Sequence, residues 1–212
     1  MTERTLTPSR NAKRLGTDRE ALDALLDEVL VGYVGLSLAE GPLVVPISYA
    51  RDGDRLLFHG STGSRRMRAL AGGAEVCFTV AAMDGLKVSR SLFGTGMRYR
   101  SAVLFGTCGV LSGDDKAAAL NRYGDRYLPG RSGEVRPMTG KELAATMVLA
   151  LPINTWSMKV ADGFPEDEPD EIAGDSWAGV LPLVQAIGDP IDNPDLRPGI
   201  PVPPSVLALY AD

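Results

Sequence analysis

The sequence contains too few metal-ligating side chains for a metal centre built from protein ligands alone. Its 212 residues include one histidine, His59, and two cysteines. Cys77 and Cys108 lie far apart, without a C-x-x-C spacing, whereas a tetrahedral protein site takes about four ligands. We therefore expect no such metal site. Both cysteines lie in apolar, strand-like runs, which predicts small buried hydrophobic side chains.

Long apolar runs and a basic surplus are also missing. No stretch approaches ~18 consecutive apolar residues, and no apolar segment follows the charged N-terminus, so the sequence predicts neither a membrane span nor a secretion signal. The formal net charge is −5, whereas general nucleic-acid binders carry excess Lys and Arg. We expect a cytoplasmic protein that binds neither membranes nor nucleic acids. No G-x-G-x-x-G follows the first strand, which argues against a Rossmann fold.

Four stretches have the spacing and caps of helices. Residues 17–32 repeat apolar side chains at helical spacing, with Thr17 as N-cap and Glu20 completing a capping box. Residues 64–73 predict a short helix that begins after Ser64 and ends at Gly72-Gly73. Two further helices are predicted over residues 114–128, with acidic residues in the first turn, and over 139–150, capped by Thr139 or Gly140.

The remaining apolar stretches are typical of strands. They cover residues 31–39, 41–50, 54–60, 74–85, 97–113 and 151–163, and they are rich in Val, Leu, Ile and aromatic residues. Turn residues separate several of them, and Asp52-Gly53 predicts a tight hairpin. Short connections favour antiparallel pairing, so we predict a mainly β barrel with short helices rather than a parallel sheet.

The C-terminal part differs in composition. Residues 164–212 hold nine of the fifteen prolines, which predicts little regular structure. Apolar side chains at Trp177, Leu181, Leu183 and Val184 nevertheless call for burial, against the same domain or a partner subunit. We therefore divide the chain into an N-terminal arm (1–16), a barrel domain (17–163) and a Pro-rich tail (164–212).

The stretch "FHGSTGSRRMRAL" (58–70) carries the histidine and a group of arginines. Cations in the first turn of a helix oppose its dipole, so Arg65, Arg66 and Arg68 would make sense if an anion bound at that end. An ordinary capped helix is the alternative, and by spacing alone His59 is a structural or surface residue.

Two further stretches suggest polar contacts. Strand alternation puts Arg98 and Arg100 on one face, where their partners could be the acidic loop, a neighbouring subunit, a phosphate or ordinary surface pairs. Pro46 indicates an edge strand, whose free backbone groups could hydrogen-bond a flat heterocycle.

Taken in order, "GPLVVPISYARDGDRLLFHGSTGSRR", "YRSAVLFG" and "WAGVLPL" resemble the FMN-binding split barrels related to pyridoxamine 5′-phosphate oxidase. Within these, the sequence is most similar to the flavin-nucleotide-binding and nitroimidazole-reductase-like branch. The resemblance implies a six-stranded antiparallel split barrel that forms a homodimer with FMN at the interface.

The resemblance also implies the cofactor contacts. Strand residues would offer backbone groups to the flavin ring, residues after them would line the ring and ribityl chain, and the serine and arginines would hold the phosphate. The implied residues are Val45, Pro46, Ile47, Ser48, Tyr49, His59, Gly60, Ser61, Ser64, Arg65, Arg66, Arg100 and Ser101. His59 is the best candidate for delivering a proton to a reduced acceptor.

The tryptophan and arginine that complete the substrate site of the true oxidases have no convincing counterparts, since Trp156 and Lys159 lack the right surroundings. Oxidation of pyridoxamine 5′-phosphate is therefore not expected. We expect instead an FMN-dependent oxidoreductase that passes electrons from a reduced nicotinamide to a small acceptor such as a nitroaromatic or quinone. The alternatives are a non-catalytic flavin carrier or sensor, or the same barrel holding a deazaflavin or haem.

Overall fold

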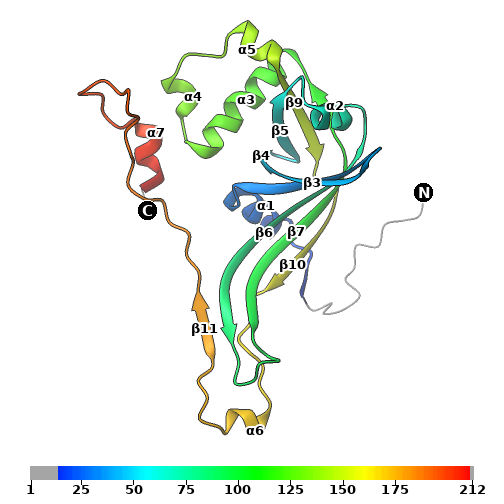
Figure 1. Ribbon diagram of the computed structural model, residues 1–212, viewed down its shortest axis with the longest axis vertical. Helices are drawn as coiled ribbons and strands as arrows, with labels where there is room; N and C mark the ends of the chain where they lie inside the picture. The colour runs from blue at the N-terminus through cyan, green and yellow to red at the C-terminus, as the bar shows by residue number, and fades with distance from the viewer. Residues whose placement is uncertain (1–13, 211–212) are drawn as a thin grey trace.

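The structure, a computed structural model that describes residues 14–210, contains two antiparallel β-sheets around a shared core (Figure 1). Within these residues the larger sheet has seven strands, in the order β1 (Leu15–Gly16), β10 (Thr155–Ala161), β7 (Gly96–Thr107), β6 (Glu75–Val88), β2 (Val31–Leu38) and β3 (Gly41–Ser48), with β11 (Gly179–Pro182) paired to β6. The smaller sheet has four, in the order β4 (Ala50–Asp52), β5 (Arg55–Ser61), β9 (Thr146–Pro152) and β8 (Gly109–Leu111). The predicted mainly β split barrel is confirmed, with short strands added to the long ones.

Short helices connect and cover the sheets. In chain order they are α1 (Arg19–Glu28), α2 (Arg65–Ala71), α3 (Gly113–Tyr127), α4 (Arg131–Glu134), α5 (Gly140–Ala145), α6 (Pro169–Ile172) and α7 (Pro204–Leu207). Over the described range, none of them combines the length and apolar composition that crossing a bilayer requires.

Local capping rules place most helix ends correctly. Ser64 caps α2, which ends at Gly72, and Thr139 caps α5 in a capping box with Glu142. The predicted cap of α1 was wrong by one residue: Asp18, not Thr17, accepts the backbone N–H of Glu20. The Asp18 carboxylate, one position later, accepts from the same backbone N–H that Thr17 was expected to cap.

Two predicted boundaries were wrong for a tertiary reason. The helix predicted over residues 139–150 ends at Ala145, and the remaining residues form β9, which pairs with β5 throughout its length. The strand predicted from Leu151 begins only at Thr155, after a turn. Burial of Leu149 and Leu151 in the barrel core, and of Val148 in the layer under α3, decides both boundaries.

Strand β5 separates two apolar layers. Leu56 and Phe58 enter the main barrel core together with side chains of α1, α2 and the larger sheet. Leu57, on the opposite face, packs with Ala119 and Tyr123 of α3 in a second cluster. The smaller sheet is therefore buried on both faces, which fixes its register.

Strands β6 and β7 extend beyond the barrel as a long hairpin (Figure 1). A β-bulge between Met83 and Gly85 leaves Asp84 as the extra residue on β6. At the far end, the carboxylate of Asp167 accepts hydrogen bonds from Ser89 and from the backbone and guanidinium of Arg90. This contact joins the hairpin to the start of the tail.

The tail contains more regular structure than its prolines predict, because β11 pairs with β6 and Ser205 of α7 donates to the carboxylate of Glu134 at 2.5 and 2.8 Å. Residues 183–201, here called the strap, link these two attachments and are exposed throughout. The expected burial of Trp177 and Val184 is not met within one chain, since they are 62% and 86% exposed. The basic N-terminal arm lies largely outside the described residues.

Gly32 tests the packing of the core. A Cβ atom there would lie 2.2 Å from the ring of Phe78, which is fully buried between Tyr49 and Phe58. We expect Gly32→Ala to lower the free energy of unfolding by about 1–3 kcal/mol through overpacking. Gly96→Ala is the control, because its Cβ would meet nothing within 4 Å. Equal denaturation midpoints for the two variants would contradict this packing.

Candidate functional site

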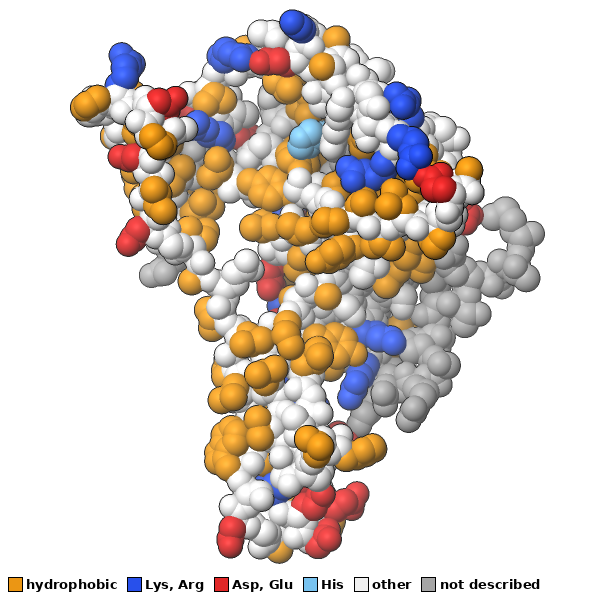
Figure 2. All heavy atoms as spheres, in the orientation of Figure 1, with side chains coloured by type: hydrophobic (Ala, Val, Ile, Leu, Met, Phe, Trp, Pro, Cys, Tyr) orange, Lys and Arg blue, Asp and Glu red, His pale blue; other side chains and the backbone are white. Residues whose placement is uncertain are grey.

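His59 lies at the open end of the layer between the smaller sheet and α3. It follows Phe58 on β5, so its side chain lies on the face of Leu57, toward α3, whereas Phe58 enters the barrel core. Its partner on β9 is Val148, which belongs to the same apolar cluster. Figure 2 shows the histidine at the surface, with apolar side chains below it and basic side chains beside it.

The imidazole is half-buried and held against an aromatic ring. Its centroid lies 4.3 Å from that of Tyr123, with the two rings nearly perpendicular at 84°. The Nδ1 atom is buried and has no hydrogen-bond partner within residues 14–210. Burial lowers the pKa of His59 below its usual value. The side chain is therefore a neutral imidazole at neutral pH. Because Nδ1 is buried, Nε2 is the nitrogen that a ligand could reach.

Tyr123 is part of a network that the sequence analysis missed. Its hydroxyl donates to Ser48 at the end of β3, and its ring lies 5.3 Å from that of Tyr127. Tyr127 in turn accepts a hydrogen bond from the backbone N–H of Tyr49. The apolar repeat Ala119, Tyr123, Tyr127 at a spacing of four residues was the available signal, since it puts all three on one helix face.

The arginine turn, residues 62–68, is formed as predicted after β5 and consists of a short loop and the first residues of α2. Gly60 allows this arrangement, because a Cβ atom would lie 2.9 Å from the Met67 side chain of α2. Ser64 caps α2 and Ser61 accepts from the N–H of Gly63. His59 and Gly60 lie on opposite faces of β5, so one flat ligand cannot contact both side-chain positions.

The two arginines of this turn differ in their surroundings. The Arg65 side chain is 71% exposed and pairs with Glu40 at 2.5 Å. Arg66 is half-buried, and its Nε has no hydrogen-bond partner in the described part of the chain. Arg68 is exposed on the same helix. The turn can therefore bind an anion without first breaking a buried ion pair.

Strand β3 is an edge strand, as Pro46 predicted. Pro46 and Ser48 lie on its exposed face, whereas Val45 and Ile47 pack into the core. Tyr49 is not available to a ligand: its ring is buried, its hydroxyl donates to the carbonyl of Leu26, and its backbone is hydrogen-bonded to Tyr127.

Arg100 and Ser101 lie elsewhere in the same chain. On β7, Ser101 lies six residues from Thr107, and Thr107 pairs with Glu75 just after α2. Six residues of extended strand span about 20 Å, which separates Ser101 from this end of β7. Arg100 is bound by Asp84 at 2.6 Å and Glu28 at 2.7 Å, and these carboxylates raise its pKa further. Its role in one chain is structural, joining α1 to the bulge of β6.

The thiols of the two cysteines are less suited than His59 to bind a metal. Cys108 is buried in the core, and burial raises the pKa of its thiol to about 12. Cys77 is half-buried on β6, and both thiols are free. In residues 14–210 no three His, Cys, Asp or Glu side chains gather as a metal site. A metal held mainly by a porphyrin needs only one or two protein ligands.

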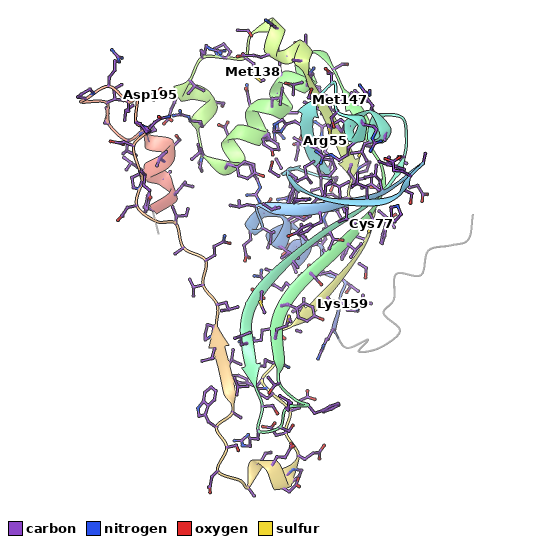
Figure 3. All side chains as sticks on the ribbon, in the orientation of Figure 1. Arg55, Cys77, Met138, Met147, Lys159 and Asp195 are labelled. Atoms are coloured by element: carbon purple, nitrogen blue, oxygen red, sulfur yellow. The ribbon has the colours of Figure 1, made fainter. Side chains whose placement is uncertain are left out.

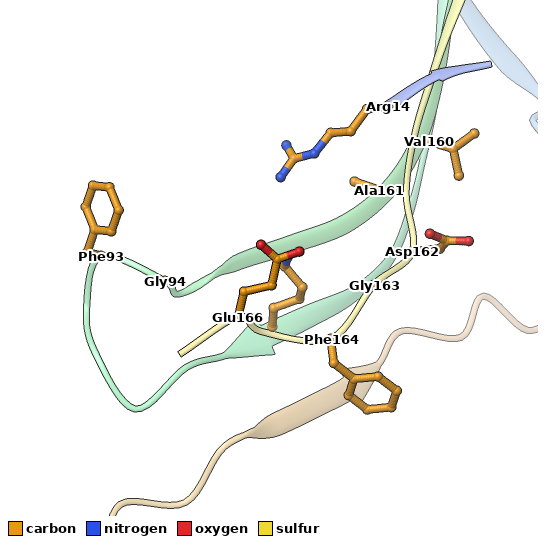
Figure 4. Close-up of a pocket in the computed structure, with 10 residues that line it drawn as sticks. Arg14, Phe93, Gly94, Val160, Ala161, Asp162, Gly163, Phe164 and Glu166 are labelled. Carbon is orange, nitrogen blue, oxygen red and sulfur yellow. The ribbon is translucent and has the colours of Figure 1, made fainter. Parts of the chain in front are cut away.

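A cavity of about 430 Å³ lies at the other end of the molecule (Figure 4). Its lining includes two basic side chains, Arg14 and Lys87, and two acidic ones, Asp162 and Glu166. Figure 3 shows Lys159 on β10 of the larger sheet, far from Arg55 on β5 of the smaller sheet. Neither location contributes to the His59 site.

Comparison with known proteins adds independent findings. The sequence model of the family described as pyridoxamine 5′-phosphate oxidase matches residues 18–160. No curated protein sequence matches the chain. Among solved structures, the FAD and heme binding protein from Mycobacterium smegmatis is 46% identical, with a TM-score of 0.90, and the match covers 92% of this chain and 97% of that one.

Two other structures extend the comparison. The flavocytochrome Anf3 from Azotobacter vinelandii is 34% identical, with a TM-score of 0.88, and the match covers 95% of this chain and 94% of that one. A structure from Bacteroides thetaiotaomicron, described as a candidate 5-nitroimidazole antibiotic resistance protein, is 20% identical, with a TM-score of 0.59 and coverage of 69% and 86%. The last similarity shows the shared fold alone.

The lowered pKa of His59 predicts a pH dependence of stability. Because the folded value lies below the unfolded value of about 6.5, the unfolded chain binds the proton more readily, and stability falls as pH drops below about 6.5. We expect the cofactor-free protein to lose more unfolding free energy than His59→Gln between neutral pH and pH of about 5.5. An equal loss of unfolding free energy in the two proteins, measured by urea denaturation at both pH values, would show that burial does not lower the pKa of His59.

Proposed function

Because the chain belongs to the pyridoxamine 5′-phosphate oxidase family, we propose that it is a flavin- and haem-binding redox protein in which His59 would bind the haem iron. The observation that carries the proposal is a half-buried, neutral imidazole at the edge of an apolar layer, whose Nδ1 is buried and whose Nε2 would bind the iron. Two structures similar over nearly the whole chain are described as a FAD and heme binding protein and a flavocytochrome.

The residues around His59 fit a haem. Histidine is a common axial ligand, and it binds iron in its neutral form, which burial favours here. Competing ligands are less available, because the hydroxyls of Tyr49 and Tyr123 are hydrogen-bonded and burial raises their pKa values. Apolar side chains near the site would contact the porphyrin and keep water from the iron.

The arginine turn fits the phosphate groups of a flavin nucleotide. Arg65, Arg66 and Arg68 provide guanidinium groups beside the Ser64 cap, a geometry suited to bidentate phosphate binding. The free edge of β3 next to Pro46 offers backbone groups to the ring. The sequence resemblance implied FMN; the full-length neighbours are described with FAD and heme or as a flavocytochrome, so we propose FAD.

His59 is a better iron ligand than proton donor. A general acid must be protonated at the working pH, and burial shifts His59 toward its neutral form. The imidazole also has no carboxylate partner in the described residues that would stabilise its charged form. The expected role in proton delivery is therefore less well supported than ligation.

A homodimer would complete the cofactor site. The outer face of the large sheet is uncovered and apolar, with Val31 and Tyr33 of β2, Val44 of β3 and Met83 of β6 exposed. Figure 2 shows apolar side chains across this region and open space beside the strap. Exposed apolar surface of this kind marks protein–protein interfaces. A second copy could cover both the sheet and the strap, and could bring its Arg100 and Ser101 toward the flavin.

A bound flavin would exchange one or two electrons and a bound haem one electron. The chain's own residues would bind and orient both groups. A reduced nicotinamide remains the expected electron donor, and a nitroaromatic or quinone the expected acceptor. Family membership does not imply pyridoxamine 5′-phosphate oxidation, since Lys159 lies far from this site.

The first test is size-exclusion chromatography of the purified protein with light-scattering and absorbance detection. We expect a dimer that carries flavin bands and a haem Soret band, and extraction should release FAD and haem in a one-to-one ratio. FMN in place of FAD would correct the flavin assignment, and a colourless monomer after reconstitution would contradict the proposal. Oxidation of reduced nicotinamide no faster than with free FAD would indicate a carrier rather than an enzyme.

The second test is His59→Ala. We expect the variant to fold and keep its flavin, to lose most haem affinity or convert the haem to a weakly ligated form, and to recover the original spectrum with added imidazole. Cys77→Ala is the matched control and should retain the wild-type haem spectrum. An unchanged Soret band in His59→Ala, with full haem occupancy, would exclude His59 as the ligand.

A further inference from the structure

Tyr123 contacts His59 from the helix that covers the smaller sheet. We infer that Tyr123 is a positioning residue that fixes the plane of the His59 imidazole, and through it the orientation of the iron ligand. The inference rests on the proposed function where it concerns the haem, but the contact between the two side chains belongs to the chain itself.

The need for such a residue follows from the Nδ1 atom of His59. A metal-binding histidine commonly donates its second ring N–H to a carbonyl or carboxylate, which fixes the ring plane. Here Nδ1 is buried and has no such partner in the described residues. The orientation must come from packing, and the Tyr123 ring, perpendicular to the imidazole at 4.3 Å, has the geometry of an attractive aromatic pair.

Tyr123 can transmit orientation because it is itself held at both ends. Its ring is buried between α3 and the smaller sheet, and its hydroxyl donates to Ser48. One helical turn later, Tyr127 bonds to the backbone of Tyr49 at 2.8 and 2.9 Å. Arg126 donates to the carbonyls of Leu26 and Val29 at 3.0 and 3.1 Å. Helix α3 is thereby fixed to α1 and to the end of β3.

The same side chain joins the two proposed cofactor regions. Ser48 lies on β3, the strand proposed to contact the flavin, and His59 lies on β5. Tyr123 contacts both. A displacement of either strand would therefore be transmitted to the other through the ring of Tyr123.

The experiment compares Tyr123→Phe and Tyr123→Leu by proton NMR of the cofactor-free chain. The chain has one histidine, so one set of imidazole protons reports on His59 without ambiguity. We expect the wild type to show ring-current-shifted imidazole signals, Tyr123→Phe to retain them, and Tyr123→Leu to move them toward free histidine. Tyr99→Leu, on β7 of the large sheet, is the matched control and should leave them unchanged.

Haem-loaded samples supply the second readout. Ferric EPR of Tyr123→Leu should show a broader spread of g values than wild type, because the ligand plane is no longer fixed, whereas Tyr123→Phe should restore the narrow spectrum. Ser48→Ala removes the same hydrogen bond as Tyr123→Phe, at an exposed position, and keeps the tyrosine ring. Like Tyr123→Phe, it should leave the imidazole signals close to those of the wild type.

The outcomes separate the two claims. Unchanged imidazole signals in Tyr123→Leu would overturn the positioning role even in a protein that binds haem. Where the leucine variant does not fold, wild-type imidazole signals at the positions of free histidine would overturn it. Displaced signals in a protein that binds no haem would support the positioning of His59 and contradict the proposed function.

Discussion

Burial on both faces of strand β5 is the constraint on which the rest of the structure depends. Phe58 packs in the barrel core against Phe78, and Leu57 packs under α3. A shift of one residue would exchange the two faces, moving Phe58 under α3 and Leu57 into the barrel core, and would turn the neighbouring His59 toward the core. The neighbouring His59 therefore has a fixed side and a fixed depth. The packing of Leu57 and Phe58, which have no chemical role, thus decides where His59 lies.

The site combines a rigid apolar layer with a polar edge. Helix α3 closes the layer and presents Tyr123 to His59, while the turn after β5 presents arginines to the solvent beside it. Ion pairs away from this edge have structural roles: Arg100 joins α1 to the β6 bulge, and Asp167 closes the far end of the hairpin. On α2, by contrast, Arg66 has an Nε without a partner in the described residues and Arg68 is exposed, so both can meet an anionic ligand.

Local chemistry made part of this arrangement predictable. The cap at Ser64, the glycine end of α2 and the Asp-Gly hairpin follow from a few neighbouring residues, and the sequence identifies them correctly. The arginine turn and the edge position of Pro46 also follow from short-range rules. The mainly β fold depends on alternation and turn residues, which are likewise local.

Contacts between distant segments were not predictable in this way. The partners of Arg100 lie on α1 and at the bulge of β6, and no local sequence pattern predicts that bulge. Within one chain, Arg100 is therefore not at its expected place beside the cofactor. Tyr123 meets His59 only after α3 folds onto β5 and β9. The strap retains exposed apolar residues that a single chain does not cover, which no local pattern could reveal.

The most direct measurement of the central claim uses the single histidine. Protein labelled with nitrogen-15 only in histidine carries the label at His59 alone, apart from any purification tag. Resonance Raman spectra of the ferrous haem should show the iron–histidine stretching band shifted to lower frequency by the label. A haem-loaded protein whose iron–ligand band does not move with the label would contradict ligation by His59.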